Sequence, residues 1–181
     1  MALLTVSDLR SDVDVGSQTG VVRVSNVSGA VRTHTGRGDQ WLRAISGDVQ
    51  ARGLLGELRL AAVAGASLNA EVVSGQIAAE GIRSQVVRLR VATGTIYLFG
   101  PLVPTARYDL AVEEGDVQVA LPTGQTPPRF SLSAVAQKLQ MGFPLVPARQ
   151  TPPGLTQGTV GGGGPLLQLR SGTGRVSVLP P

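Results

Sequence analysis

The sequence contains no cysteine, one histidine and few aromatic residues. Without cysteine, the 181-residue chain has neither a disulfide nor a thiolate metal ligand. Its single histidine, His34, is too little for a histidine-rich metal site or a histidine-based catalytic relay. Aromatic residues make up 3% of a chain that is 42% hydrophobic, so Val, Leu, Ile and Ala must fill the core. This favours thin, regular layers over a core built around large rings.

Acidic residues and prolines are each missing from a large part of the chain. Residues 1–116 hold 11 arginines and 12 acidic residues, whereas residues 117–181 hold no Asp or Glu. The excess positive charge therefore lies in the last third. It comes from Arg129, Lys138, Arg149, Arg170 and Arg175. All 12 prolines lie at or after Pro101.

The sequence has no segment that predicts membrane insertion. Its longest apolar run, 53–73, is interrupted by Glu57, Arg59, Asn69 and Glu71. The first residues lack the basic region of a signal peptide. We expect a cytoplasmic protein if Met1 is the natural start. If the chain is a domain excised from a longer exported protein, we expect it in the cell envelope or at the surface.

Glycine recurs every nine residues over the first half of the chain. The positions are 20, 29, 38, 47, 56 and 65, after which the spacing loosens to Gly75, Gln85 and Gly94. Apolar residues tend to follow each anchor by two and by four positions, a period-two alternation that indicates strands. A Leu/Ala-rich helix over 54–72 is the alternative. The glycines inside that window and the continuing repeat argue against it.

A longer version of the repeat follows residue 94. Four segments, at 89–101, 110–122, 132–144 and 168–180, align as strand, tight turn, strand and proline. The last gap holds a long Pro/Gly-rich loop, 148–164. We expect one domain over 1–181, composed of a cap strand at 1–19, nine-residue repeats at 20–100 and longer repeats at 101–181.

Regular corners predict an all-β fold, a β-solenoid. Glycine suits corners because it tolerates positive φ and close backbone approach. Short strands between corners can stack coil upon coil about 4.8 Å apart, so that several coils bury an apolar side that one coil cannot. The pattern gives a single-stranded, β-helix-like stack of roughly fifteen short strands, or about seven two-strand rungs. The terminal "LPP" predicts one blunted end, because proline cannot donate to a ladder.

The recurrent turns "SGDV", "EGDV", "VSGQI" and "TGTI", with the ending "LRSGTGRVSV", carry a resemblance. Over about residues 20–180 the chain resembles the bacterial adhesin β-strand-repeat family, also called the toast-rack domain. The resemblance implies a β-solenoid with one sheet per face, often attached to envelope or stress-response proteins. It supplies no catalytic residues.

Several short motifs have a structural explanation beside the functional one. In the "RGD" at 37–39, the repeat already requires Gly38, and Asp39 occupies the turn position of Asp48 and Asp116, so we favour coincidence over an adhesion motif. "GTGR" and "GGGGP" lack the context of a phosphate loop. His34 is predicted to be solvated, and Asp12 with Asp14 supply too few oxygens for calcium.

If each rung has two strands, the residues three after each anchor form two outward rows. One row carries Arg23, Trp41, Arg59, Ala78 and Tyr97, with Arg43 and Phe99 nearby. The other carries Arg32, Gln50, Asn69 and Arg88, with Arg52 and Arg90 nearby. We predict contact residues on the first face. They are Trp41, Arg43, Arg59, Tyr97 and Phe99. Alternatively, the aromatic residues pack under the loop 148–164.

These features favour a non-catalytic structural or interaction module over an enzyme. A rigid solenoid presents flat faces to a protein partner or to itself, as a monomer or small oligomer. Polyanion or nucleic-acid binding through the five cations of the last third is the alternative. The acidic "VEEGD" segment at 112–116 is a weak catalytic candidate, since Asp116 occupies a corner position. We expect no cofactor, no metal and no small-molecule substrate.

Overall fold

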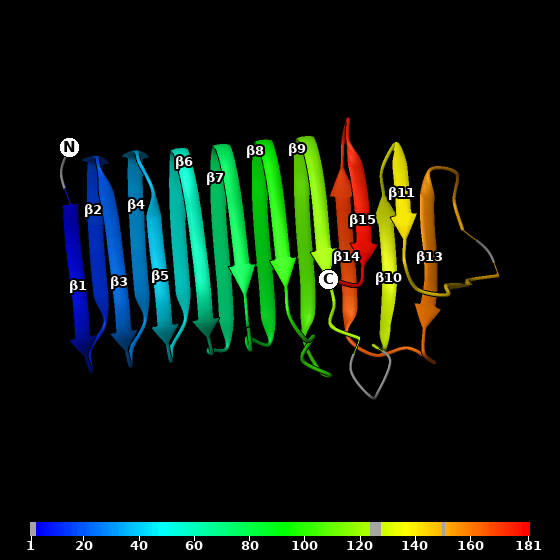
Figure 1. The fold of residues 1–181 in the computed structure, drawn as a ribbon, viewed down its shortest axis with the longest axis horizontal. Helices are drawn as coiled ribbons and strands as arrows, with labels where there is room; N and C mark the ends of the chain where they lie inside the picture. Colours follow the sequence, from blue (N-terminus) through cyan, green and yellow to red (C-terminus); the bar gives the residue numbers. More distant parts are fainter. Residues whose placement is uncertain (1–2, 124–127, 150) are drawn as a thin grey trace.

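The computed structural model describes residues 3–123, 128–149 and 151–181, and this part of the chain contains 15 strands and no helix. The strands are β1 (Leu3–Leu9), β2 (Val13–Thr19), β3 (Val21–Val27), β4 (Val31–Arg37), β5 (Gln40–Ile45), β6 (Val49–Val63), β7 (Ser67–Glu80), β8 (Val86–Phe99), β9 (Arg107–Ala120), β10 (Phe130–Val135), β11 (Lys138–Met141), β12 (Val146–Pro147), β13 (Leu155–Val160), β14 (Leu166–Ser171) and β15 (Arg175–Leu179). They wind into a β-solenoid, which confirms the predicted all-β fold (Figure 1). The alternative helix at 54–72 is wrong, because β6 and β7 cover most of that window.

The solenoid has two opposite faces joined by corners. The β1 face consists of β1, β3, β5, the second halves of β6 to β9, β15 and β11. The β2 face consists of β2, β4, the first halves of β6 to β9, β14, β10, β13 and β12. Neighbouring strands are parallel throughout, except that β13 is antiparallel to both β10 and β12.

The register explains the nine-residue spacing of glycine. Val13 pairs with Val31, and Val31 with Val49, so one turn takes 18 residues. The next turn brings Val49 beside Leu68. Nine residues are therefore half a turn, from one face to the other. The predicted two-strand rung is confirmed.

Stacked glycines form a column at each of the two edges. The column at the upper edge of Figure 1 consists of Gly20, Gly38, Gly56, Gly75, Gly94, Gly115 and Gly174. At Gly38, φ is 137°, and a Cβ would overlap the carbonyl oxygen of Gly20 on the preceding turn. Only glycine fits this combination of positive φ and close backbone approach. The opposite edge has Gly29, Gly47 and Gly65 in the same stacked relationship.

Aspartates tie successive corners together. The carboxylate of Asp39 accepts a hydrogen bond from the backbone N–H of Glu57, one turn later, at 2.9 Å. The corresponding donors are Ser67 for Asp48 and Arg175 for Asp116, both at 2.8 Å. Asp12 makes the same kind of bond to Ala30. The turn position predicted for Asp39, Asp48 and Asp116 is therefore structural, because each carboxylate bonds to the backbone of the next turn.

The core lies between the two faces as ladders of apolar side chains. One ladder on the β2 face runs through Val31, Val49, Leu68 and Val87, each at most 1% exposed. A polar cluster interrupts this core. The amide of buried Gln40 on β5 donates to Thr35 Oγ1 at 2.8 Å and accepts from Thr33 Oγ1, both on β4. Gln40 thus links the faces with its polar atoms satisfied.

The turns are not stacked in sequence order near the C-terminus. β14 and β15 pair with both halves of β9, and β10 and β11 stack outside them. The final turn is inserted between two earlier ones, so the four longer repeats do not follow one another along the axis as we expected. Their shared motif cannot encode which neighbour each one pairs with.

The two ends of the stack also differ from expectation. In the segment 1–19, where we expected one cap strand, the described residues 3–19 form two strands, β1 and β2, that pair like any later turn. The terminal prolines lie beside β9 and β15 within the stack and do not blunt an end. Instead, antiparallel β13 and short β12 cover the far end of the β2 face, so that part of the predicted loop 148–164 is a strand. On the β1 face, the four-residue β11 is the last strand.

Candidate interaction surfaces

The predicted outward row exists on the β1 face. Backbone pairing aligns Arg23 with Trp41, Trp41 with Arg59, Arg59 with Ala78, and Ala78 with Tyr97. Adjacent positions in such a ladder are about 4.8 Å apart, so Trp41 and Tyr97 lie roughly 14 Å apart along the axis. Ala78 contributes only a methyl group between them.

Two arginines flank the indole of Trp41. The Arg23 guanidinium carbon lies 4.3 Å from the ring centre, and that of Arg59 lies 5.5 Å away. Both separations suit cation–π attraction, which contributes about 0.5–1 kcal/mol at exposed sites. Arg59 is itself held by Glu57, with 2.8 Å between Arg59 Nε and Glu57 Oε1. That carboxylate, through its hydrogen bond and charge, raises the pKa of Arg59.

Phe99 lies in the neighbouring outward row, which aligns Arg43, Ala61, Glu80 and Phe99. Phe99 and Tyr97 border a hollow of about 450 Å³ that Pro180 and Pro181 also line. The prolines reach this position because the last turn is inserted beside β9. Their contribution was missed in the sequence, which gave no sign of the insertion.

The aromatic residues of this face are exposed. The exposed fractions are 37% for Trp41, 40% for Tyr97 and 43% for Phe99. The alternative, in which the segment 148–164 covers them, is wrong because its strand β13 pairs with β10 at the end of the stack. Three of the six aromatic residues therefore lie on one open surface. By contrast, Tyr108 and Phe130 are fully buried.

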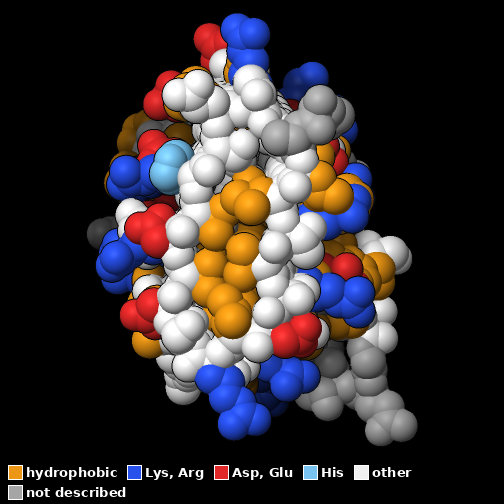
Figure 2. Space-filling view, turned by 90° about the vertical axis from the view of Figure 1, so that its left-hand side faces the viewer, with side chains coloured by type: hydrophobic (Ala, Val, Ile, Leu, Met, Phe, Trp, Pro, Cys, Tyr) orange, Lys and Arg blue, Asp and Glu red, His pale blue; other side chains and the backbone are white. Residues whose placement is uncertain are grey.

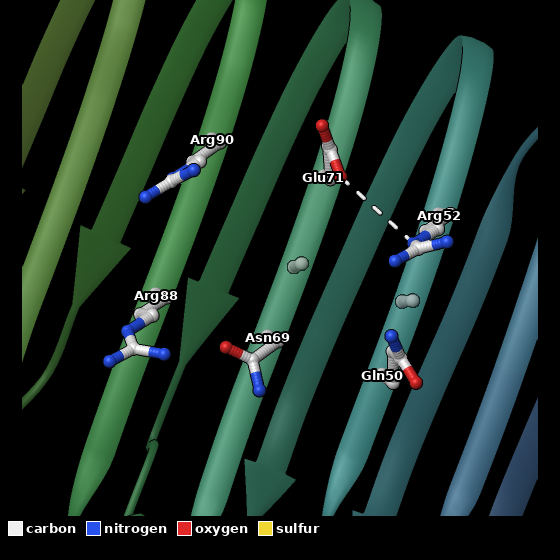
Figure 3. Close-up of a pocket in the computed structure, with 8 residues that line it drawn as sticks. Gln50, Arg52, Asn69, Glu71, Arg88 and Arg90 are labelled. Atoms are coloured by element: carbon white, nitrogen blue, oxygen red, sulfur yellow. Dashed lines mark ion pairs between the residues drawn. The ribbon is translucent and has the colours of Figure 1, made fainter.

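The β2 face has a polar hollow of about 220 Å³ over β6, β7 and β8 (Figure 3). The polar and charged residues that line this hollow, labelled in Figure 3, are Gln50, Arg52, Asn69, Glu71, Arg88 and Arg90. The predicted row Arg32, Gln50, Asn69 and Arg88 is confirmed by the pairing. Arg52 Nε lies 4.0 Å from Glu71 Oε2, and both side chains are exposed. Glu71 is also the ladder neighbour of Arg90, so negative charge divides the arginines of this hollow.

The five cations of the last third do not form one surface. Lys138 on β11 and Arg175 on β15 are neighbours on the β1 face. Arg170 lies on β14, on the β2 face. Arg129 precedes β10, and Arg149 follows β12. All five are exposed, but the fold separates charges that are close in sequence.

Other motifs are explained by the corners. Within "RGD", Gly38 belongs to a glycine column, and the Asp39 carboxylate bonds to the next turn. The Asp116 carboxylate of the "VEEGD" segment does the same. His34 is exposed and its ring lies over Gly16. Among the described residues, no group of three or more His, Cys, Asp or Glu residues is arranged to hold a metal ion.

In the part of the chain that the structure describes, no helix has the length and hydropathy to cross a membrane. Comparisons of the chain with family models, with curated proteins and with solved structures find no match.

Proposed function

We propose that this chain is a non-catalytic interaction module, a rigid β-solenoid whose β1 face binds a protein partner. The observation that supports this most strongly is the exposure of Trp41, Tyr97 and Phe99 on one face of a chain that has only six aromatic residues. Tryptophan, tyrosine and arginine are the residues that most often dominate binding energy at protein interfaces.

The fold lowers the cost of ordering these residues. Trp41 and Tyr97 project from strands paired on both sides, so their backbones are fixed before binding. Arg23 and Arg59 also restrict the indole of Trp41. Binding surfaces that are ordered in advance lose less conformational entropy on association.

The same residues indicate the chemistry of the partner. An apolar group can contact Trp41, Tyr97 and Phe99, and carboxylates can meet the surrounding Arg23 and Arg43. We therefore propose a partner surface of apolar residues flanked by Asp or Glu. The resemblance to the toast-rack domain, which rests on the turn motifs, fits a module attached to envelope or stress-response machinery.

Polyanion binding through the last third has less support. It would require Arg129, Lys138, Arg149, Arg170 and Arg175 to act together, and they lie on different faces and segments. Catalysis by the "VEEGD" segment is also less well supported, since Asp116 is already bonded to a backbone N–H.

The test compares capture by two surface variants. One carries Trp41→Ala and Tyr97→Ala on the β1 face, and its matched control carries Arg52→Gln and Arg88→Gln on the β2 face. All proteins are immobilised and exposed to extracts of cells that carry the gene, and bound proteins are quantified by mass spectrometry.

We expect at least one protein to bind the unmodified chain and the control. Its binding to the β1-face variant should be weaker by about 10-fold or more, as for the loss of interface hot spots. Capture that is unchanged by the β1-face substitutions, or that requires the β2-face arginines instead, would contradict the proposal. Circular dichroism of both variants checks that the solenoid remains folded.

A further inference from the structure

The N-terminal end of the solenoid is open on both faces. Within the described residues, β1 pairs only with β3, and β2 pairs only with β4. Each therefore has a second edge whose outward N–H and C=O groups have no strand beside them. Both strands are seven residues long. Unpaired edges of this kind are templates for adding another strand.

The apolar core is exposed between these two edges. Leu4 is 41% exposed, whereas Val22, its neighbour in the same ladder, is 0% exposed. Leu9 is 39% exposed, and its neighbour Val27 is 1% exposed. Figure 2 views the molecule from this end and shows these exposed apolar side chains as a band between two rows of backbone atoms. Charged side chains lie mainly around its rim.

This end lacks the features that usually protect a sheet edge. β1 and β2 contain no Lys, Arg or Pro, and their charged residues are Asp8 and Asp14. Proteins commonly prevent edge pairing with lysine, proline or a covering segment. At the opposite end, β13 and the short β12, which contains Pro147, cover the β2 face. On the β1 face of that end, β11 pairs only with β15 among the described strands, but it has four residues and begins with Lys138.

We propose that the N-terminal end binds a second copy of this chain, with its edge strands antiparallel across a two-fold axis. Such an axis can place β1 of one copy antiparallel to β1 of the other, and β2 antiparallel to β2. Alternatively, it can place β1 of one copy antiparallel to β2 of the other, since the two strands have equal length. It also brings the two apolar bands together. The interface is isologous, so it closes at two copies. The far ends disfavour a longer stack, because β13 and β12 cover the β2 face there and β11 offers an edge of only four residues. This proposal concerns the end of the solenoid and does not depend on the partner proposed for the β1 face.

The size of the end determines how strong the dimer can be. A strand of seven residues spans about 23 Å, and packed sheets lie about 10 Å apart. The area of such an end is small compared with the area that stable interfaces bury, which is about 1,200–2,000 Å² in total. Backbone hydrogen bonds along two edges add to the apolar contact. We therefore expect a reversible dimer whose fraction rises with concentration.

The mass of the full chain in solution tests the proposal. Light scattering or analytical ultracentrifugation from about 1 µM to about 500 µM should show a shift from monomer towards dimer and no larger species. Val6 on β1 is partly buried and pairs with Val24 of the core. Val6→Lys therefore places a charge inside the band and should raise the dissociation constant about 100-fold, because a buried charge without a partner is costly. The control, Gln168→Lys, adds the same charge on β14, a strand paired on both sides by β9 and β10, and should dimerise like the unmodified chain.

Hydrogen exchange locates the interface even if Val6→Lys fails to fold. At high concentration the unmodified chain should exchange more slowly in residues 3–19, and exchange in β12 and β13 should not change. A monomer at every concentration, protection that rises at β12 and β13 instead, or open-ended polymers would each overturn the proposal.

Discussion

The guanidinium of Arg23 covers the indole of Trp41 from the neighbouring strand, with 4.3 Å between the guanidinium carbon and the ring centre. Arg59 lies on the other side of Trp41 along the same row. Because Trp41 is the sole tryptophan of the chain, its fluorescence reports on this one surface.

Iodide and acrylamide should quench Trp41 differently. Two nearby arginines attract an anion but not a neutral molecule, an effect that salt screening limits to about 10 Å at 0.1 M. We predict that Arg23→Gln lowers the ratio of the iodide to the acrylamide quenching constant, by roughly two-fold at low ionic strength. Arg88→Gln on the opposite face is the control and should leave the ratio unchanged. An unchanged ratio in Arg23→Gln would mean that the two side chains do not associate in solution.

Gly75 should tolerate no side chain. Its φ is 143°, and a Cβ there would overlap the carbonyl oxygen of Gly56. We predict that Gly75→Ala lowers the free energy of unfolding by more than about 3 kcal/mol, since backbone must move on both turns. In Gly53→Ala the new Cβ would lie 3.4 Å from the Gln40 side chain, an ordinary contact, and the loss should stay within about 1 kcal/mol. Urea unfolding of the two variants measures both values.

Ala44 and Ala62 adopt left-handed conformations, with φ of 53° and 54°. Because this conformation costs an L-residue about 1–2 kcal/mol, glycine should relieve it despite its greater flexibility when unfolded. We predict that Ala44→Gly and Ala62→Gly each stabilise the fold by about 0.5–1 kcal/mol. Ala61→Gly, which is not in that region, should destabilise it. Thermal unfolding distinguishes these cases, and destabilisation by all three would contradict the backbone geometry.

The buried hydroxyl of Tyr108 should make stability fall at alkaline pH. Burial raises the pKa of Tyr108 above its ordinary value of 10.0, although the Val103 N–H that donates to its oxygen partly lowers it. The folded state thus holds this proton more tightly than the unfolded chain. Its contribution to stability is complete below about pH 10 and is lost as the pH rises through the folded-state pKa.

Tyr108→Phe isolates this effect. At neutral pH the variant should be about 1 kcal/mol less stable, because the Val103 N–H loses its acceptor. As the pH rises above about 10, this difference should shrink. Urea unfolding at several pH values from neutral upward measures it in both proteins. A constant difference at every pH would show that the hydroxyl remains in contact with water.

The inserted last turn predicts unequal effects of deleting either terminal turn. Removing residues 166–181 would leave the outer edges of both halves of β9 without their partners β14 and β15. We expect this deletion to lower the free energy of unfolding by more than about 4 kcal/mol or to abolish folding. Deleting residues 2–19 removes an end turn and should cost much less, as expected when each turn contacts only its neighbours. Equal losses would contradict the insertion.

Regular spacing made much of this fold predictable. A nine-residue glycine interval, combined with period-two alternation, correctly aligned Trp41 with Arg59 because nine residues are half a turn. The Gln40 cluster was missed, although a signal existed: Gln40 lies 18 residues after Val22, at a position otherwise apolar. The neighbours of the last turn could not be predicted, because long-range pairing is not recorded in local alternation. The binding roles of the surface residues stay predictions.

The position of β14 and β15 constrains how the chain can fold. From β1 to β9 each strand pairs with one about 18 to 21 residues away, as in Val87 with Tyr108, but Leu110 pairs with Leu169. During synthesis the earlier turns can assemble in the order in which they emerge. The β10–β13 unit, however, cannot reach its final place until the segment that separates it from β9 has been made. For an interval the nascent protein therefore has two free sheet edges, and chaperone binding or misassembly between chains should concentrate in that interval.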